Sequence, residues 1–274
     1  MTAAPVRVGL PWLGLRETAD AAARASDLVD QIRRYLPGGS RTVIHDLGCG
    51  TGSMGRWLAP QLTGTQHWIL YDRDAELLAY TAADLPAVAA DGGAVSIETR
   101  QRDITRLDPG DLAGASLITA SAVLDMMTAE ELERFVLSCA HASCPALVTL
   151  SVVGRVELTP ADPLDERFAG AFNAHQRRTT GGRRLLGPDA VGAAVDAFAR
   201  LGADVLVRPS PWRLGAAQAA LTVEWFTGWV GAACEQQPEL IAVAAAYAGR
   251  RLAEAAAGRL NVMVDHQDLL ARPR

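Results

Sequence analysis

Apolar residues recur along the chain with two alternating spacings, one typical of strands and one typical of helices. Strands are expected over residues 41–47, 66–71, 94–100, 116–120 and 146–153, with helices over 53–62, 74–85 and 128–140 between them. Thr128 and Glu131 have the spacing of a capping box at the start of the third helix. Strands separated by helices in this way predict parallel β-α-β units with helices on both faces of the sheet.

Helical patterns flank this repeat. An N-terminal helix is predicted over residues 17–36, ended by Pro37-Gly38-Gly39, where it would cap the sheet. After residue 153 the pattern predicts helices over 163–178, 188–201, 215–234 and 238–257, with short strands over 204–207 and 260–264.

Composition narrows the classes of function. The 274 residues are 49% hydrophobic and 21% charged, which is typical of a globular chain with one sizeable core. The net charge of −5 disfavours nucleic acid as a partner. All 26 basic residues are arginine, so a Schiff-base lysine and the lysine of a phosphate-binding P-loop are excluded. The abundance of Ala, Arg and Gly favours a bacterial source.

The cysteines and the N-terminus point to a reducing compartment. None of the four cysteines lies in a Cys-x-x-Cys pair, so neither a disulfide framework nor a metal site is predicted. Residues 1–11 lack the basic and apolar regions of a secretory signal, and apolar runs elsewhere are too short to span a membrane. We expect a cytoplasmic protein without membrane contacts.

A glycine-rich turn, Gly48-Cys49-Gly50-Thr51-Gly52, joins the first predicted strand to the following helix. Missing Cβ atoms let a ligand approach the backbone, and the start of a helix offers free N–H groups. Residues 50–55 also satisfy the G-x-G-x-x-G pattern of dinucleotide sites, so the turn by itself leaves a nicotinamide cofactor open.

Asp46, which ends the first strand just before the glycines, distinguishes these ligands. Its carboxylate suits an ammonium group and repels a pyrophosphate. The run His45-Asp46-Leu47-Gly48-Cys49-Gly50-Thr51-Gly52 resembles the class I, Rossmann-like, S-adenosylmethionine-dependent methyltransferase family. The resemblance implies an α/β fold with a mostly parallel seven-stranded sheet, an antiparallel last strand, an N-terminal helix and helical insertions. It also implies S-adenosylmethionine as cofactor and S-adenosylhomocysteine as product.

Two further acids stand where this family has them. By resemblance, Asp72 after the second strand accepts hydrogen bonds from the ribose hydroxyls, and Asp103 after the third strand accepts one from the adenine amino group. Each acid also suits a simpler role as a cap or loop residue. The complete set predicted to bind the cofactor is Asp46, Gly48, Cys49, Gly50, Gly52, Asp72, Arg73, Asp103, Ile104 and Ser121.

The sequence defines the residues that would contact the methyl acceptor less clearly than those for the cofactor. Asp125 lies in the loop that runs beside the transferable methyl group in relatives, where it would deprotonate or orient the acceptor, although a cap or ion pair explains it equally well. His175, on a predicted helix after the fifth strand, is a second candidate base, with packing as its alternative. The Asn-Pro-Pro-Tyr motif of many amino-group and DNA methyltransferases is absent.

Other polar and aromatic residues have two interpretations each. Arg16 and Arg24 either reach the carboxylate of the cofactor or form ion pairs. A divalent-metal site at Asp162, Asp165 and Glu166 is disfavoured by their placement at a helix start. Four aromatic residues either line a pocket or belong to the core, and these are Trp212, Trp225, Phe226 and Trp229.

The sequence therefore predicts methyl transfer to an oxygen or nitrogen of a small molecule by a monomer or homodimer. We expect one domain over residues 1–274, divided into an N-terminal helical cap (1–40), a cofactor-binding core (41–153) and helical substrate-side segments (154–202 and 213–258). The alternatives are a non-catalytic methyltransferase-like binding subunit, an NAD-dependent oxidoreductase and a nucleic-acid methyltransferase.

Overall fold

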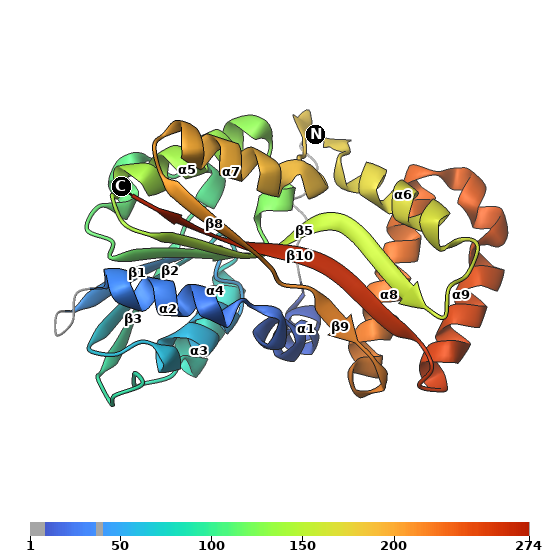
Figure 1. Ribbon diagram of the computed structural model, residues 1–274, viewed down its shortest axis with the longest axis horizontal. Coiled ribbons are helices and arrows are strands. Elements are labelled where there is room, and N and C mark those ends of the chain that lie inside the picture. Colours follow the sequence, from blue (N-terminus) through green and yellow to red (C-terminus); the bar gives the residue numbers. More distant parts are fainter. Residues whose placement is uncertain (1–8, 37–40, 274) are drawn as a thin grey trace.

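A computed structural model describes residues 9–36 and 41–273, and in this part of the chain a twisted eight-stranded sheet runs through the molecule (Figure 1), while β6 (Thr179–Thr180) and β7 (Arg183–Arg184) form a separate two-stranded sheet. The strand order is β3-β2-β1-β4-β5-β10-β8, with β9 paired to β10. The parallel strands are β1 (Thr42–Leu47), β2 (Gln66–Asp72), β3 (Val95–Gln101), β4 (Leu117–Ser121) and β5 (Ala146–Thr159). The strand β10 (Asn261–Arg272) is antiparallel to β5 on one side and to β8 (Asp204–Pro209) and β9 (Trp212–Leu214) on the other. The predicted fold class is confirmed.

The edge beside β10 explains why eight strands occupy seven positions. β8 pairs with the second half of β10 and β9 with its first half, and only Ser210 and Pro211 separate them. Proline cannot donate to a strand ladder, so the edge is interrupted there. The expected seven-stranded arrangement is therefore preserved.

Helices cover both faces of the parallel part of the sheet. On one face, α2 (Ser26–Tyr35), α3 (Ser53–Leu58) and α4 (Ala75–Asp84) bury apolar residues against Trp68 and Leu70 of β2. On the other face, α5 (Ala129–His141) and α7 (Ala190–Arg200) contribute to the apolar cluster that contains Ile69 and Tyr71 of the same strand and Val148 of β5. Successive strand residues point to opposite faces, so this continuous apolar strand supplies both layers. The capping box of Thr128 and Glu131 is confirmed.

A third apolar cluster lies at the far end of the molecule. Here α1 (Leu10–Ala23), α6 (Asp165–Gln176), α8 (Ala219–Gln236) and α9 (Ile241–Ala256) pack around the extensions of β5 and β10 (Figure 1). Both strands are longer than predicted, because polar residues on their outward faces break the apolar pattern while the antiparallel β5–β10 ladder continues. This long pair carries the helical segments to one side of the parallel sheet.

The prediction of one N-terminal helix over 17–36 is wrong. Two helices occur, α1 and α2, and Arg24 and Ala25 separate them. The backbone N–H of Ala25 donates to the carboxylate of buried Asp268 in β10 (2.8 Å), a partner that sequence pattern does not reveal. Pro37-Gly38-Gly39 lies outside the described residues.

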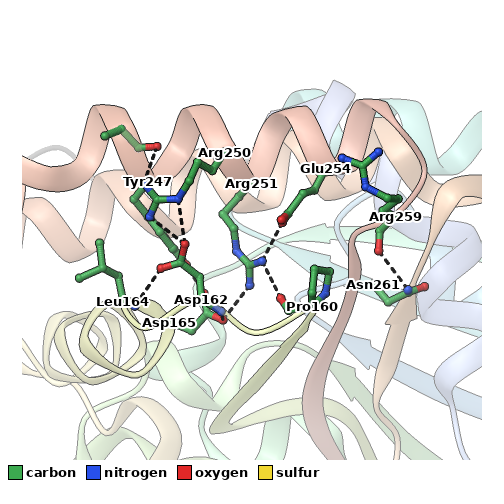
Figure 2. A network of polar contacts seen from close by, with 11 residues as sticks. Pro160, Asp162, Leu164, Asp165, Tyr247, Arg250, Arg251, Glu254, Arg259 and Asn261 are labelled. Carbon is green, nitrogen blue, oxygen red and sulfur yellow. Dashed lines mark hydrogen bonds and ion pairs between the residues drawn. The ribbon is translucent and has the colours of Figure 1, made fainter.

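A buried arginine fastens α9 to the segment that follows β5 (Figure 2). Arg251, which is 1% exposed, donates to the carbonyl of Pro160 (2.6 Å) and to the carboxylates of Asp165 and Glu254 (2.7 Å each). The hydroxyl of Tyr247 donates to the other oxygen of Asp165 (2.7 Å). Asp165 of α6 thus joins this helix to α9.

Candidate active site

A cavity of about 380 Å³ opens at the carboxyl ends of the parallel strands. In open parallel sheets this edge is where ligands bind. The cavity brings together the predicted site residues Asp46, Gly48, Cys49, Gly50, Asp72, Arg73, Asp103, Ile104, Ser121 and Asp125. Gly52 and His175 are not among its lining residues.

The glycine turn has the backbone that its sequence demands. Gly48, Gly50 and Gly52 all have positive φ angles, of 72°, 56° and 83°. A Cβ atom on Gly52 would lie 2.5 Å from Cγ2 of Thr81, so this glycine permits close packing against α4 and faces away from the cavity. The N–H of Gly50 donates to Asp72 (3.0 Å), which ties the turn to the end of β2.

Asp46 is a buried carboxylate with one oxygen satisfied. Its Oδ1 accepts a hydrogen bond from the hydroxyl of Thr119 (2.7 Å), whereas Oδ2 has no partner among residues 9–36 and 41–273. Burial raises the pKa of Asp46 to about 6. An orphaned buried oxygen of this kind favours a donor or cation supplied by a ligand.

Arg24 lies behind two serines of the cavity wall. Its guanidinium donates to Oγ of Ser53 (3.1 Å) and to Oγ of Ser121 (3.2 Å), and Arg24 itself is 4% exposed. The hydroxyl of Thr149 also donates to Oγ of Ser121 (3.1 Å). Since the Ser121 oxygen accepts two hydrogen bonds, its own proton is free to be donated to a ligand acceptor.

The other two acids combine structural and cavity-lining roles. Asp72 accepts from the backbone of Gly50 and of Asp74, the latter at 2.9 Å. Asp103 accepts from the backbone and hydroxyl of Thr105, at 3.0 and 2.8 Å, and starts a short 3-10 helix. An ionised carboxylate has about four acceptor positions, so each acid retains capacity for a ligand.

Asp125 lies in the cavity wall just after β4. Burial raises the pKa of Asp125 to about 6, so this carboxyl group titrates close to neutral pH. A hydrogen bond from its own backbone N–H, and then the positive charges of Arg16 and Arg178, lower the pKa only in part, and no described side chain donates a hydrogen bond to the carboxylate. Asp125 therefore has the exposure to the cavity and the proton affinity of a general base.

His175 occupies a different position. It lies in α6 with Nε2 3.1 Å from a carboxylate oxygen of Glu235 in α8 and Nδ1 3.2 Å from the guanidinium of Arg178. Burial, as the main cause, and the charge of Arg178 lower its pKa. The structure thus gives His175 a contact between two helices, apart from Asp125.

Sequence reasoning missed several lining residues. His266 of β10 is 4% exposed, and burial lowers its pKa to about 3, so its ring is neutral near physiological pH. Trp12 and Leu13 of α1 also line the cavity. Nothing in the local sequence of these residues signals a ligand, because long-range packing alone brings them to the strand ends.

Two of the three acids weighed as metal ligands, Asp162 and Asp165, have other partners. Asp162 pairs with Arg250 (2.7 Å) and Asp165 with Arg251, as Figure 2 shows. Within the described ranges, no cluster of three or more His, Cys, Asp or Glu has the arrangement of a metal site. The helices of the same ranges include none with the length and apolar character needed to cross a bilayer.

Comparison with known proteins agrees with this geometry. Residues 44–145 match the family described as "Methyltransferase domain". This segment includes Asp46, the glycine turn, Asp72, Asp103 and Asp125. No curated protein sequence matches the chain significantly.

Three solved structures illustrate the likeness in fold. A mycolic acid cyclopropane synthase complexed with S-adenosylhomocysteine is 14% identical, with 90% of this chain and 84% of that chain covered and a TM-score of 0.48. An S-adenosylmethionine-dependent methyltransferase from Thiobacillus denitrificans is 13% identical, with 98% and 100% covered and a TM-score of 0.48. A geranyl diphosphate methyltransferase is 11% identical, with 99% and 93% covered and a TM-score of 0.43.

The matched segment contains the glycine turn and the three acids that the cavity gathers at the strand ends. Residues 44–145 of this chain therefore form a methyltransferase domain, built on the parallel strands β1 to β4 of the sheet.

Proposed function

We propose that this enzyme transfers the methyl group of S-adenosylmethionine to an oxygen or nitrogen atom of a small molecule. The observation that carries the proposal is the placement of groups of opposite charge at one end of the cavity. Asp46 has an unpartnered buried oxygen, and Arg24 polarises the hydroxyls of Ser53 and Ser121. An amino-acid zwitterion, such as the methionyl part of the cofactor, matches this arrangement.

The adenosyl part of the cofactor is assigned to the neighbouring strand ends. Asp72 would accept hydrogen bonds from the two ribose hydroxyls, and Asp103 would accept one from the adenine amino group. Gly48, Cys49 and Gly50 form the wall between these acids and Asp46, while Arg73 and Ile104 flank the nucleoside. Gly52 is assigned to supporting the turn, since its missing Cβ makes room for Thr81.

For methyl transfer, the main task of the protein is to align the acceptor atom with the methyl group of the cofactor. When bound, the cofactor supplies a methyl group on a positively charged sulfur, and the sulfur keeps the bonding electron pair as the acceptor lone pair bonds to the methyl carbon. The carboxylate of Asp125 would take the proton that the acceptor oxygen or nitrogen loses. The helix α1 covers this end of the cavity and helps to exclude water.

Two alternatives suit the cavity less well. The buried carboxylate of Asp46 next to the glycine turn would repel the pyrophosphate of NAD. The net charge of −5 disfavours a nucleic-acid substrate.

A binding titration followed by an activity screen tests the proposal. We expect calorimetry to detect S-adenosylhomocysteine and S-adenosylmethionine but not NAD. The variant Asp72→Ala should weaken cofactor binding by about 1–3 kcal/mol through the loss of hydrogen bonds to a charged group. Asp30→Ala, which removes an exposed acid paired with Arg33, is the matched control and should bind normally.

Turnover is then measured as release of S-adenosylhomocysteine together with a mass increase of one methyl group in the acceptor. Tight binding of NAD without a response to S-adenosylmethionine would contradict the proposal. Methylation at carbon only, in every acceptor that turns over, would contradict the assignment to oxygen or nitrogen.

A further inference from the structure

The cavity continues beyond the predicted cofactor site into an aromatic compartment. We define the acceptor compartment by Trp12, Val156, Phe172, Trp212, Trp225 and Val264, which line the same cavity and belong to the apolar cluster formed by the helices around β5 and β10. These residues come from α1, β5, α6, β9, α8 and β10, at the side of the molecule where the β5–β10 pair meets the helices (Figure 1). Its walls are therefore made of indole and phenyl rings with aliphatic side chains between them.

Two of the rings are held in fixed orientations. The indole N–H of Trp212 donates to Asp20 (2.9 Å), and Trp212 is 3% exposed. The guanidinium of Arg16 lies 5.0 Å from the ring centre of Trp212 and 6.0 Å from that of Trp12. Rings fixed in this way present flat apolar surfaces without having to reorganise when a ligand binds.

The arginines that line the cavity on the side of the acceptor compartment and of Asp125 are paired with acidic side chains. Next to the compartment, Arg16 makes two hydrogen bonds to Asp20, at 2.9 and 3.2 Å. Elsewhere in the cavity wall, closer to Asp103, Arg183 makes two to Glu131, at 2.9 and 2.6 Å. His266 is neutral. Asp125 lines the same cavity, and no cation among the described residues makes a hydrogen bond or ion pair with its carboxylate, although Arg16 and Arg178 act on it from a distance.

From these contacts, and resting on the proposed function, we infer that the methyl acceptor is an uncharged, ring-bearing molecule that presents a hydroxyl or amino group to Asp125. The rings of Trp12, Trp212 and Trp225 supply stacking and apolar contact. The carboxylate of Asp125 accepts a hydrogen bond from a hydroxyl or amino group of the acceptor. It repels an acceptor that carries a carboxylate or phosphate, because no unpaired cation among the described residues of the compartment offsets that negative charge. The compartment thereby selects by charge as well as by shape.

The inference is tested by binding in the presence of saturating S-adenosylhomocysteine, which allows ternary complexes without turnover. The probes are 2-naphthol, its amine analogue 2-naphthylamine and its anionic analogue 2-naphthoate at neutral pH, followed by calorimetry and tryptophan fluorescence. We expect the naphthol, the amine or both to bind, and the naphthoate to bind at least about tenfold more weakly. Equal or tighter binding of the naphthoate would overturn the inference.

Two variants test whether Asp125 causes the selectivity against anions and whether Trp225 binds the ring. Asp125→Asn should reduce the preference for naphthol over naphthoate to less than about threefold, while Asp30→Asn, an exposed acid far from the cavity, should preserve it. Trp225→Leu should weaken the preferred ring compound by about tenfold and leave S-adenosylhomocysteine affinity unchanged, which also demonstrates that the variant is folded. Unchanged naphthol selectivity in Asp125→Asn would overturn the role of that residue.

The two levels of proposal fail in different ways. If S-adenosylhomocysteine itself does not bind, the proposed function is wrong. If S-adenosylhomocysteine binds but none of the ring compounds does, only the inference on the acceptor is wrong.

Discussion

The guanidinium of Arg24 donates to the hydroxyl of Ser121, 97 residues later in the chain, at 3.2 Å. This bond joins the linker between α1 and α2 to the end of β4, directly beside the glycine turn. Arg24 thus contributes positive charge to the cavity through two serine hydroxyls. We assign it the role of a positioning residue, because Ser53 and Ser121 line the cavity and Arg24 lies behind them.

Replacing Arg24 should selectively weaken recognition of the cofactor carboxylate. In Arg24→Gln we expect S-adenosylhomocysteine to bind about 1.5–3 kcal/mol more weakly, the range for hydrogen bonds to charged groups. Adenosine, which lacks the amino-acid part, should bind with unchanged affinity in calorimetry. An equal loss for both ligands would mean that Arg24 supports the cavity as a whole, and exposed Arg33→Gln controls for the lost charge.

The methylation rate should depend on the ionisation of Asp125. Its pKa is raised to about 6, so kcat should fall as the pH drops below about 6 and the carboxylate becomes protonated. Asp125→Asn should lower kcat by about 100-fold or more and remove this acidic limb of the pH profile. A profile that keeps its acidic limb in the variant would assign the base elsewhere.

The same group should make folding stability depend on pH in the opposite sense. Because the folded-state pKa of Asp125 lies above that of the unfolded chain, the folded protein binds the proton more tightly, and stability falls as pH rises from about 4 to 6. Asp125→Asn is therefore expected to raise the free energy of unfolding at neutral pH by about 1–2 kcal/mol. Urea denaturation at neutral and acidic pH measures this, and a lower stability at neutral pH would contradict it.

The ion pair between Glu17 and Arg56 should control how firmly α1 covers the cofactor. Two hydrogen bonds of 2.6 Å join these side chains, and a Cβ atom on Gly50 would lie 3.6 Å from Leu13 of α1. In Glu17→Gln we expect amide exchange in residues 10–23 to rise and S-adenosylhomocysteine to dissociate about fivefold faster, the equivalent of about 1 kcal/mol. Stopped-flow displacement tests the rate, and an unchanged rate with increased exchange would mean that α1 does not gate release.

The buried pair of Arg251 and Asp165 should dominate the stability of the helical end. Arg251→Met leaves Asp165 without its cationic partner and should cost about 3–5 kcal/mol in the free energy of unfolding. The neighbouring Arg250→Met removes the ion pair between half-exposed Arg250 and Asp162 and should cost less than about 1 kcal/mol. Adding Asp165→Asn to Arg251→Met should recover part of the loss, whereas a further loss would show that the carboxylate is not the source.

The sequence by itself determined the parallel α/β core and the half of the cavity that we assign to the cofactor. Asp46 and the glycine turn are neighbours in the chain, and Asp72 and Asp103 follow successive strands whose carboxyl ends meet at one edge of a parallel sheet. Each of these features depends on local pattern and on a rule of strand order. Their convergence on one cavity therefore needed no knowledge of side-chain packing.

Only the tertiary structure decided which residues line the half of the cavity that we assign to the acceptor. Trp212 meets Asp20 across 192 residues, and Asp268 meets Ala25 across 243 residues. The same packing places His175 against Glu235, away from the cavity, and extends β5 and β10 beyond their apolar patterns. Such contacts arise from the shapes and charges of elements far apart in the chain, and short-range periodicity carries no information about them.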